Sequence, residues 1–344
     1  MRNFDHSRLK SLEAYLSTHI DSFSGPLEIS KFPDGQSNPT YRMNTPQSKY
    51  VLRKKPDGNL LHSAHAIDRE FRVMNALHGA GIPTPRCLHL CEDEEVIGTM
   101  FFIMEFVEGT IFWNPSLPEL NNTDRSKIYD HMNQVLANIH TISPKSIGLA
   151  DFGKPGNYFA RQTDRWARQY EHSATESIEE MDCLIQWLKE NLPADQGNDC
   201  IVHGDYRLDN LIFDSKKLEV LAVLDWELST LGHPYADVAY QCMQLRLPDN
   251  NVLPGLGYVN RRDLGIPNEL EYVEMYCRRR NLDGISDWNF YLAFSFFRFA
   301  AILQGVKKRA LDGNASSNRA LELTKLVRPL AVMGIKVSVK ENNR

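Results

Sequence analysis

Residues 201–241 read IVHGDYRLDNLIFDSKKLEVLAVLDWELSTLGHPYADVAYQ, and this stretch decides the fold. Three apolar segments in it end or begin at a polar residue, namely Asp205, Asn210 and Asp225. Because Asp and Asn are poor strand formers, we expect all three in loops at strand ends, with their side chains free. A turn near 214–217 would pair the last two segments as a hairpin and bring the three polar side chains to one end of it.

Phosphoryl transfer needs this set of side chains. One residue orients and deprotonates the attacking hydroxyl, and two more hold Mg²⁺ on the phosphates. Asp205 precedes Asn210 by five residues, which is the kinase spacing of base and metal ligand. The alternative is a surface loop whose acids only cap turns. The apolar strand before the motif and the hairpin after it favour catalysis, with Asp205 as the base and Asn210 and Asp225 as metal ligands.

The rest of the chain predicts an α+β protein. Residues 26–55 hold three short segments rich in β-branched and aromatic residues, followed by a helical pattern and two more strand-like segments. That order predicts an antiparallel sheet with one embedded helix. Helical patterns dominate afterwards, apart from a β insertion at 200–226. We therefore expect a small β-rich lobe at 1–108 that binds nucleotide, and a larger, mostly helical lobe at 109–344 with the catalytic loop and acceptor site.

Composition excludes several classes of protein. The 39 basic and 44 acidic residues give a net charge of −5, which argues against a dedicated nucleic-acid-binding protein. Charged residues such as Asp5, Arg8 and Lys10 stand where a signal peptide would be apolar. The longest apolar run, 290–297, is far shorter than the about 20 residues of a membrane span. We expect a cytoplasmic protein that binds neither nucleic acid nor membrane, and no obligate protein partner is evident.

The motifs HGDYRLDN, LDWE and GHPYADVA together resemble the signature of the aminoglycoside phosphotransferase/choline kinase family, whose fold is protein-kinase-like. GQSNPTYRM, YVLRKKP, SAHAIDREFRVM, YFARQTDRWARQY and FRFAAILQGVKKRALDGNASS are similar to the branch with the kinase domains of acyl-CoA dehydrogenase family members ten and eleven. These segments cover about residues 30–320. The resemblance implies a bilobal kinase that uses Mg²⁺ and ATP, with GTP as an alternative donor, on a small-molecule hydroxyl. For this branch the implied acceptors are hydroxy-acyl compounds, as CoA thioesters.

The resemblance also implies roles around the catalytic loop. Asp205 becomes the base, and Asp237 becomes an architectural residue that braces the loop through hydrogen bonds, as a buried acid requires. Arg207 lies two residues after the base, where it could neutralise the transferring phosphoryl group. His203 is expected to be a packed, hydrogen-bonded loop residue.

In the small lobe, DGQSNPTY corresponds to the loop over the nucleotide, where Gly35, Ser37 and Asn38 could donate to phosphates. An ordinary hairpin turn is the alternative. The resemblance aligns Arg53 with the lysine that kinases use, and arginine is a planar, bidentate group with a different geometry. Glu70 would form an ion pair with Arg53. Alternatively, Glu70 is an ordinary solvent-exposed charge on a helix.

MEFVEG matches the hinge between lobes. Backbone groups of Glu105 and Val107 would contact the purine edge, and Met104 would line the nucleotide pocket.

Residues 261–309 contain nine basic and six acidic side chains, a surface that would suit a phosphate-bearing acceptor. Solvated helix faces are the alternative. Arg298 differs because it interrupts the apolar segment FSFFRFAAIL, where an arginine usually has a specific partner. We assign it to the acceptor site.

These observations predict an ATP-dependent kinase that transfers the γ-phosphoryl group to a small-molecule hydroxyl. An aminoglycoside or aminoalcohol phosphotransferase is the nearest alternative. A nucleotide-binding pseudokinase with a regulatory role is the alternative from another class, and Arg53 keeps it open.

Overall fold

The computed structural model describes residues 6–32, 38–56, 66–195, 197, 199–249, 253–312 and 322–339. The chain divides into two compact units. The first comprises Met1–Thr110, Ile147–Leu149 and Leu211–Ser229, and the second comprises Ile111–Ser146, Ala150–Asn210 and Thr230–Arg344.

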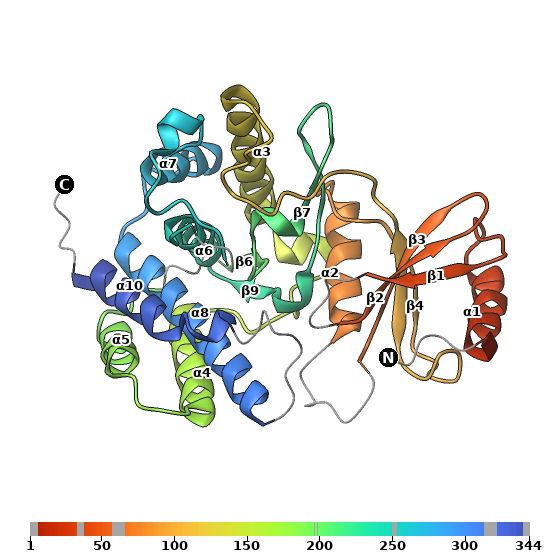
Figure 1. The fold of residues 1–344 in the computed structure, drawn as a ribbon, viewed down its shortest axis with the longest axis horizontal. Coiled ribbons are helices and arrows are strands. Elements are labelled where there is room, and N and C mark those ends of the chain that lie inside the picture. The colour runs from red at the N-terminus through yellow and green to blue at the C-terminus, as the bar shows by residue number, and fades with distance from the viewer. Residues whose placement is uncertain are drawn as a thin grey trace. The chain divides into compact units, whose positions relative to one another are not determined.

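The first unit contains a five-stranded antiparallel sheet with the strand order β1-β2-β3-β5-β4 (Figure 1). The strands are β1 (Glu28–Lys31), β2 (Thr40–Asn44), β3 (Lys49–Lys54), β4 (Cys87–Cys91) and β5 (Phe101–Glu105). Helix α2 (Ile67–Gly79) lies between β3 and β4 in the sequence. The predicted order of three strands, one helix and two strands is confirmed.

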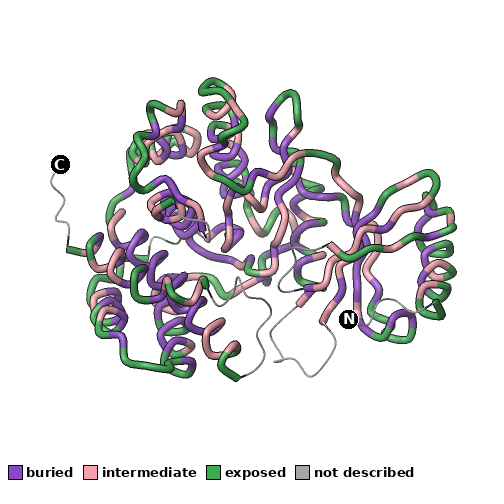
Figure 2. The backbone as a smooth tube through the Cα atoms, viewed as in Figure 1, coloured by how far each residue is buried: buried purple, intermediate pink, exposed green. Residues whose placement is uncertain are grey.

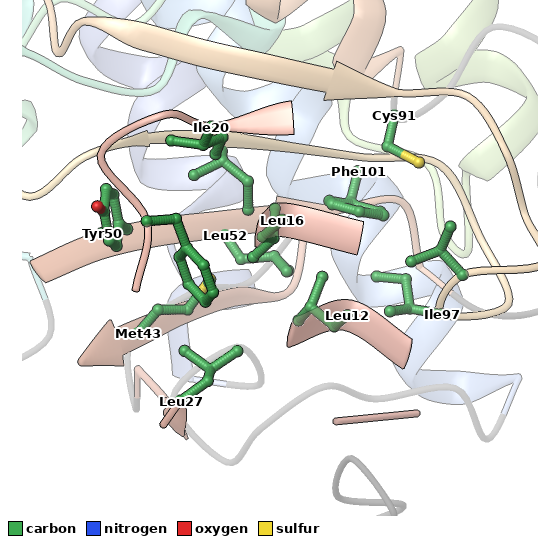
Figure 3. Close-up of a cluster of buried hydrophobic side chains, with 13 residues drawn as sticks. Leu12, Leu16, Ile20, Leu27, Met43, Tyr50, Leu52, Cys91, Ile97 and Phe101 are labelled. Atoms are coloured by element: carbon green, nitrogen blue, oxygen red, sulfur yellow. The ribbon is translucent and has the colours of Figure 1, made fainter. Parts of the chain in front are cut away.

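Helix α1 (His6–His19) covers one face of this sheet (Figure 3). Leu12 and Leu16 are four residues apart and share a helix face, and both are fully buried against Leu52 and Phe101. Each buried leucine or phenylalanine of this kind contributes about 1.5–3 kcal/mol. Neighbouring strand residues point the other way, so Phe102 contacts Phe71 of α2 with ring centroids 5.9 Å apart.

A hairpin from the middle of the chain completes the first unit. Its strands are β7 (Leu211–Phe213) and β8 (Val220–Val223). Phe213 exchanges two backbone hydrogen bonds of 2.9 Å with Thr110, and the Val223 N–H donates to the carbonyl of Pro83 at 2.8 Å. The expected division into 1–108 and 109–344 therefore differs from the two units: the hairpin belongs to the small one because its backbone partners are there.

The second unit is mostly helical. Its helices are α3 (Asn122–Thr141), α4 (Tyr158–Ser173), α5 (Glu179–Glu190), α6 (Tyr235–Arg246), α7 (Glu269–Arg280), α8 (Trp288–Leu311) and α10 (Val327–Val339). A two-stranded sheet pairs β6 (Cys200–Val202) with β9 (Thr230–Gly232).

Helix α8 forms the core of this unit, and α4, α5, α6 and α10 pack against it. Every residue from Phe290 to Ala301 is buried (Figure 2). By length and composition α8 could cross a membrane, yet 83% of its most apolar stretch is covered by the protein itself. It is the core helix of this unit, and its nearly all-round apolar sequence follows from packing on several sides.

His233 makes the second unit sensitive to acid. Its ring stacks on Tyr291 with centroids 5.8 Å apart, and burial lowers the pKa of His233 to about 4. An unfolded histidine has a pKa near 6.5, so below that pH the unfolded chain binds a proton that the folded chain rejects. The free energy of unfolding should therefore fall as the pH is lowered from 6.5, by about 2 kcal/mol at pH 5 from this residue alone.

Denaturant unfolding of the wild type and of His233→Gln at pH 7.5 and pH 5 tests this. Glutamine stays neutral and can still accept the Tyr235 N–H, which His233 Nδ1 accepts at 3.3 Å. The variant should lose less stability between the two pH values than the wild type does. Equal losses would show that His233 does not carry the acid sensitivity.

Candidate active site

The loop of residues 203–210, in the second unit, is held by one buried carboxylate. Asp237, in the first turn of α6, accepts the backbone N–H of His203 at 2.7 Å and that of Gly204 at 2.8 Å. Gly204 has φ +85°, a conformation that a side chain would disfavour. His140 of α3 bonds the same carboxylate through Nε2 at 3.2 Å, and its Nδ1 bonds the hydroxyl of Tyr276 at 2.8 Å.

The charges of this network follow from burial. Burial lowers the pKa of His140, so the imidazole is neutral and can donate from Nε2 while Nδ1 accepts from Tyr276. Burial alone would raise the pKa of Asp237, but the bonds from His140 and the loop outweigh it, and the pKa of Asp237 is lowered. An ionised carboxylate at this place takes at least three hydrogen bonds, which is what a buried charge needs.

Asp205 lies on this loop with its backbone and side chain both fixed. Its N–H donates to Nδ1 of His203 at 3.1 Å, so His203 is a packed, hydrogen-bonded residue of the loop. The Asn210 amide donates to the Asp205 carbonyl at 2.9 Å and to its carboxylate at 3.2 Å. Tyr240 of α6 also interacts with that carboxylate: burial, the charge of Asp205 and a hydrogen bond to it raise the pKa of Tyr240. The predicted base and one predicted metal ligand are thus in direct contact.

Arg207 is paired with Asp209, which the sequence reasoning did not single out. Nε of Arg207 donates to Oδ1 at 2.7 Å, and Nη2 bonds the other carboxylate oxygen. This pair lines a small pocket together with Trp113, Gln241 and Gln244. A role for Arg207 at the transferring phosphoryl group stays a prediction.

The first unit holds a second charged cluster, centred on Arg53 of β3. Its guanidinium bonds Glu70 of α2 at 2.7 Å, Asp225 at 2.9 Å and Glu227 at 3.5 Å. The expected Arg53–Glu70 ion pair is therefore present. One cation faces three carboxylates, a net charge of −2 when all are ionised. Burial raises the pKa of Glu70, with Arg53 opposing and Asp225 adding to the shift.

This cluster suits a divalent cation. Asp225 and Glu227 offer carboxylate oxygens, the ligands that Mg²⁺ prefers, and their negative excess is what such an ion neutralises. Asp225 itself has φ 65° and ψ 59°, a left-handed conformation between β8 and the short helix Trp226–Leu228. Non-glycine residues held in this region are often functional, and Asp tolerates it better than most.

Two more residues contact the cluster around Arg53. Thr40 accepts from Arg53 at 3.3 Å. Asn38 is 1% exposed, and its amide donates to Glu227 at 3.4 Å. Gly35 and Ser37, predicted in the same loop, lie outside the described residues.

At the expected hinge, Met104 is buried in β5 and its neighbour Glu105 is tied to Arg86. The Glu105 N–H donates to the Arg86 carbonyl at 3.0 Å, and the Glu105 carboxylate accepts the Arg86 N–H at 2.9 Å. The Glu105 N–H therefore cannot donate to a purine without losing its hydrogen bond to the Arg86 carbonyl. Val107 has no backbone hydrogen bond to the described residues.

Sequence reasoning missed Glu227, His140 and Tyr240. Glu227 could have been found, since it follows Asp225 by two residues in LDWE, at the same strand end. His140 and Tyr240 carry no local signal, because their partners are distant in the sequence: 97 residues separate His140 from Asp237.

The chain is similar to known proteins in sequence and in fold. The model of the phosphotransferase enzyme family (APH) matches residues 28–264. Mouse acyl-CoA dehydrogenase family member 10 is 51% identical over 336 residues, which is 97% of this chain and 31% of that protein. The chain thus spans about a third of the length of this relative.

Solved structures show the same fold. A Ralstonia eutropha protein provisionally named an aminoglycoside phosphotransferase superposes with a TM-score of 0.88 at 48% identity, covering 98% of this chain and 99% of that one. The phosphotransferase APH(4)-Ia in its ternary complex with AMP-PNP and hygromycin B has a TM-score of 0.63 at 15% identity, over 96% and 99% of the two chains. The α+β, kinase-like fold is therefore confirmed, and the family model together with the 51% identical relative places this chain in the phosphotransferase enzyme family.

Proposed function

We propose that the protein is a kinase that transfers the γ-phosphoryl group of ATP to the hydroxyl of a small molecule, with GTP as the alternative donor. The observation that carries this proposal is the loop of residues 203–210. Asp205 is oriented there by Asn210 and by His203, and the loop itself is fixed by the buried Asp237. A carboxylate held in a fixed position, within hydrogen-bond reach of the acceptor hydroxyl, is what a general base requires.

In the proposed reaction, the Asp205 carboxylate accepts a hydrogen bond from the acceptor hydroxyl and takes its proton as the new P–O bond forms, while the bond between the γ-phosphorus and the bridging oxygen breaks and ADP leaves. Mg²⁺ held by Asn210 and Asp225 would neutralise the charge of the phosphates. Arg53 binds phosphate oxygens through the guanidinium edge that now bonds Asp225 and Glu227. Glu70 keeps that guanidinium in place through the Nε bond.

For the acceptor we propose a hydroxy-acyl compound, as its CoA thioester. The name of the mouse relative supports this class. The expected basic surface at 261–309 gives weaker support, because four of its nine cations pair with acids, among them Arg279 with Asp130 and Lys307 with Glu176. Aminoglycosides or aminoalcohols are the second candidate, supported by the ligand named in the APH(4)-Ia structure.

Replacement of Asp205 by Asn tests the base. The variant keeps the shape and the Asn210 contact but cannot take a proton, so transfer should fall by about 10²–10⁴-fold. Single-turnover transfer from ATP·Mg²⁺ is measured across hydroxy-acyl-CoAs, aminoglycosides and choline-like alcohols. Asp214→Asn is the matched control, because Asp214 lies in the exposed β7–β8 turn, where its carboxylate only caps backbone N–H groups.

Undiminished transfer by Asp205→Asn would refute the proposed mechanism. If no acceptor is phosphorylated while ATP still raises the melting temperature of the wild type, the pseudokinase alternative replaces the kinase.

Arg53→Lys tests the phosphate clamp. A lysine keeps the charge but cannot bridge Glu70 and a phosphate with one planar group, so we expect the KM for ATP to rise by about 10-fold or more. Lys49→Met removes a cation from the same strand at an exposed pair with Glu108 and should leave that KM unchanged. An unchanged KM in Arg53→Lys would show that Arg53 only balances the acids around it.

A further inference from the structure

Arg298 is a buried cation that has aromatic neighbours in place of an acid. It lies in α8 and is 6% exposed. Its guanidinium carbon is 5.6 Å from the ring centroid of Trp166 and 5.3 Å from that of Tyr240. Within the described part of the chain it has no hydrogen bond and no ion pair. The two rings offset part of the cost of burial, but the five N–H donors of the guanidinium remain for another group.

Two further donors on α4 also have no acceptor. The indole nitrogen of Trp166 and the hydroxyl of Thr163 are buried and form no hydrogen bond with the described residues. They are three residues apart, so they share the same face of α4, the helix that packs against α8. Unpaired buried donors are rare in folded proteins and call for an explanation.

These donors lie close to the catalytic loop within the same unit. Tyr240, whose ring stacks on Arg298, also interacts with the carboxylate of Asp205. One tyrosine side chain therefore separates the buried guanidinium from the proposed base. A small acceptor could contact both.

Two other arginines of the second unit behave differently. Arg279 is paired with Asp130 at 2.6 Å and Arg246 with Glu269 at 2.5 Å. Their charges are matched within the protein, whereas that of Arg298 is not. An unmatched guanidinium inside the apolar helix α8 therefore points to a ligand that pairs with Arg298.

We propose that Arg298, with the Trp166 N–H and the Thr163 hydroxyl, binds an oxyanion of the acceptor. The proposal rests on the proposed function, in which the acceptor hydroxyl approaches Asp205. The oxyanion is a carboxylate or a phosphate, both of which match a guanidinium edge. The acceptor class is thus an anionic hydroxy compound, and polycationic aminoglycosides are disfavoured by a buried positive charge.

Direct binding without nucleotide tests the site. Isothermal titration compares 3-hydroxybutyrate, 3-hydroxybutyramide, the pantetheine thioester of 3-hydroxybutyrate and 3-hydroxybutyryl-CoA. If the carboxylate is recognised, the acid binds better than the amide. If a CoA phosphate is recognised, the CoA ester binds better than the pantetheine ester. Equal affinity within both pairs overturns the proposal.

Variants show whether Arg298 is responsible. Arg298→Gln should lower the affinity for the preferred anionic probe by about 10- to 100-fold, and Arg298→Lys should lower this affinity less. Arg309→Gln removes a charge from an exposed position of the same helix and should leave binding unchanged. Wild-type affinity in Arg298→Gln overturns the proposal.

Thr163→Val separates ligand binding from a structural role. Because the hydroxyl has no partner among the described residues, its loss should leave the melting temperature unchanged or raise it, while anion binding weakens. A lower melting temperature with unchanged anion binding would show that Thr163 serves the fold alone, and would remove it from the site.

The two proposals can fail separately. Anion binding that depends on Arg298 in a protein that transfers no phosphoryl group would keep the site and refute the kinase function. Transfer that depends on Asp205, combined with wild-type anion binding by Arg298→Gln, would keep the function and refute the site.

Discussion

The buried carboxylate of Asp237 is the interaction on which the second unit depends. It accepts two consecutive backbone N–H groups of the loop of residues 203–210 and a bond from His140, whose other nitrogen reaches Tyr276. Three helices, α3, α6 and α7, are thereby tied to one turn of the chain. Removing the His140 side chain would take one hydrogen bond from this buried carboxylate and leave the Tyr276 hydroxyl unpaired, a cost of about 1–3 kcal/mol. The position of Asp205 follows from this arrangement, since the loop has little freedom left.

The charged cluster of the first unit has an excess of negative charge. There Arg53 faces Glu70, Asp225 and Glu227. The strained backbone of Asp225 belongs to the same cluster. A negative excess next to a single arginine is unfavourable in isolation and becomes favourable with a divalent cation. Arg53 contacts three carboxylates at once because its guanidinium is a planar group with several donors.

Local patterns in the sequence predicted much of this. The Asp205–Asn210 spacing and the sequence order of strands and helix in the first unit depend on residues close in sequence, whereas the Arg53–Glu70 pair was expected from the family resemblance. Long-range pairing was not predicted. Strand β6 pairs with β9, so the catalytic loop joins two separate small sheets, and the β7–β8 hairpin belongs to the first unit. Two of the cations expected in the basic surface pair with acids more than a hundred residues away, Arg279 with Asp130 and Lys307 with Glu176, and no local pattern contains that information.

The central claim is that a hydroxyl attacks the γ-phosphorus of ATP at a site built around Asp205. Phosphorus-31 NMR of a single-turnover mixture of enzyme, ATP·Mg²⁺ and 3-hydroxybutyryl-CoA tests this most directly. The account predicts one ADP and one new phosphomonoester for each enzyme molecule that reacts. ADP accompanied only by inorganic phosphate, or ATP that remains bound and unchanged with every hydroxyl acceptor, would contradict it.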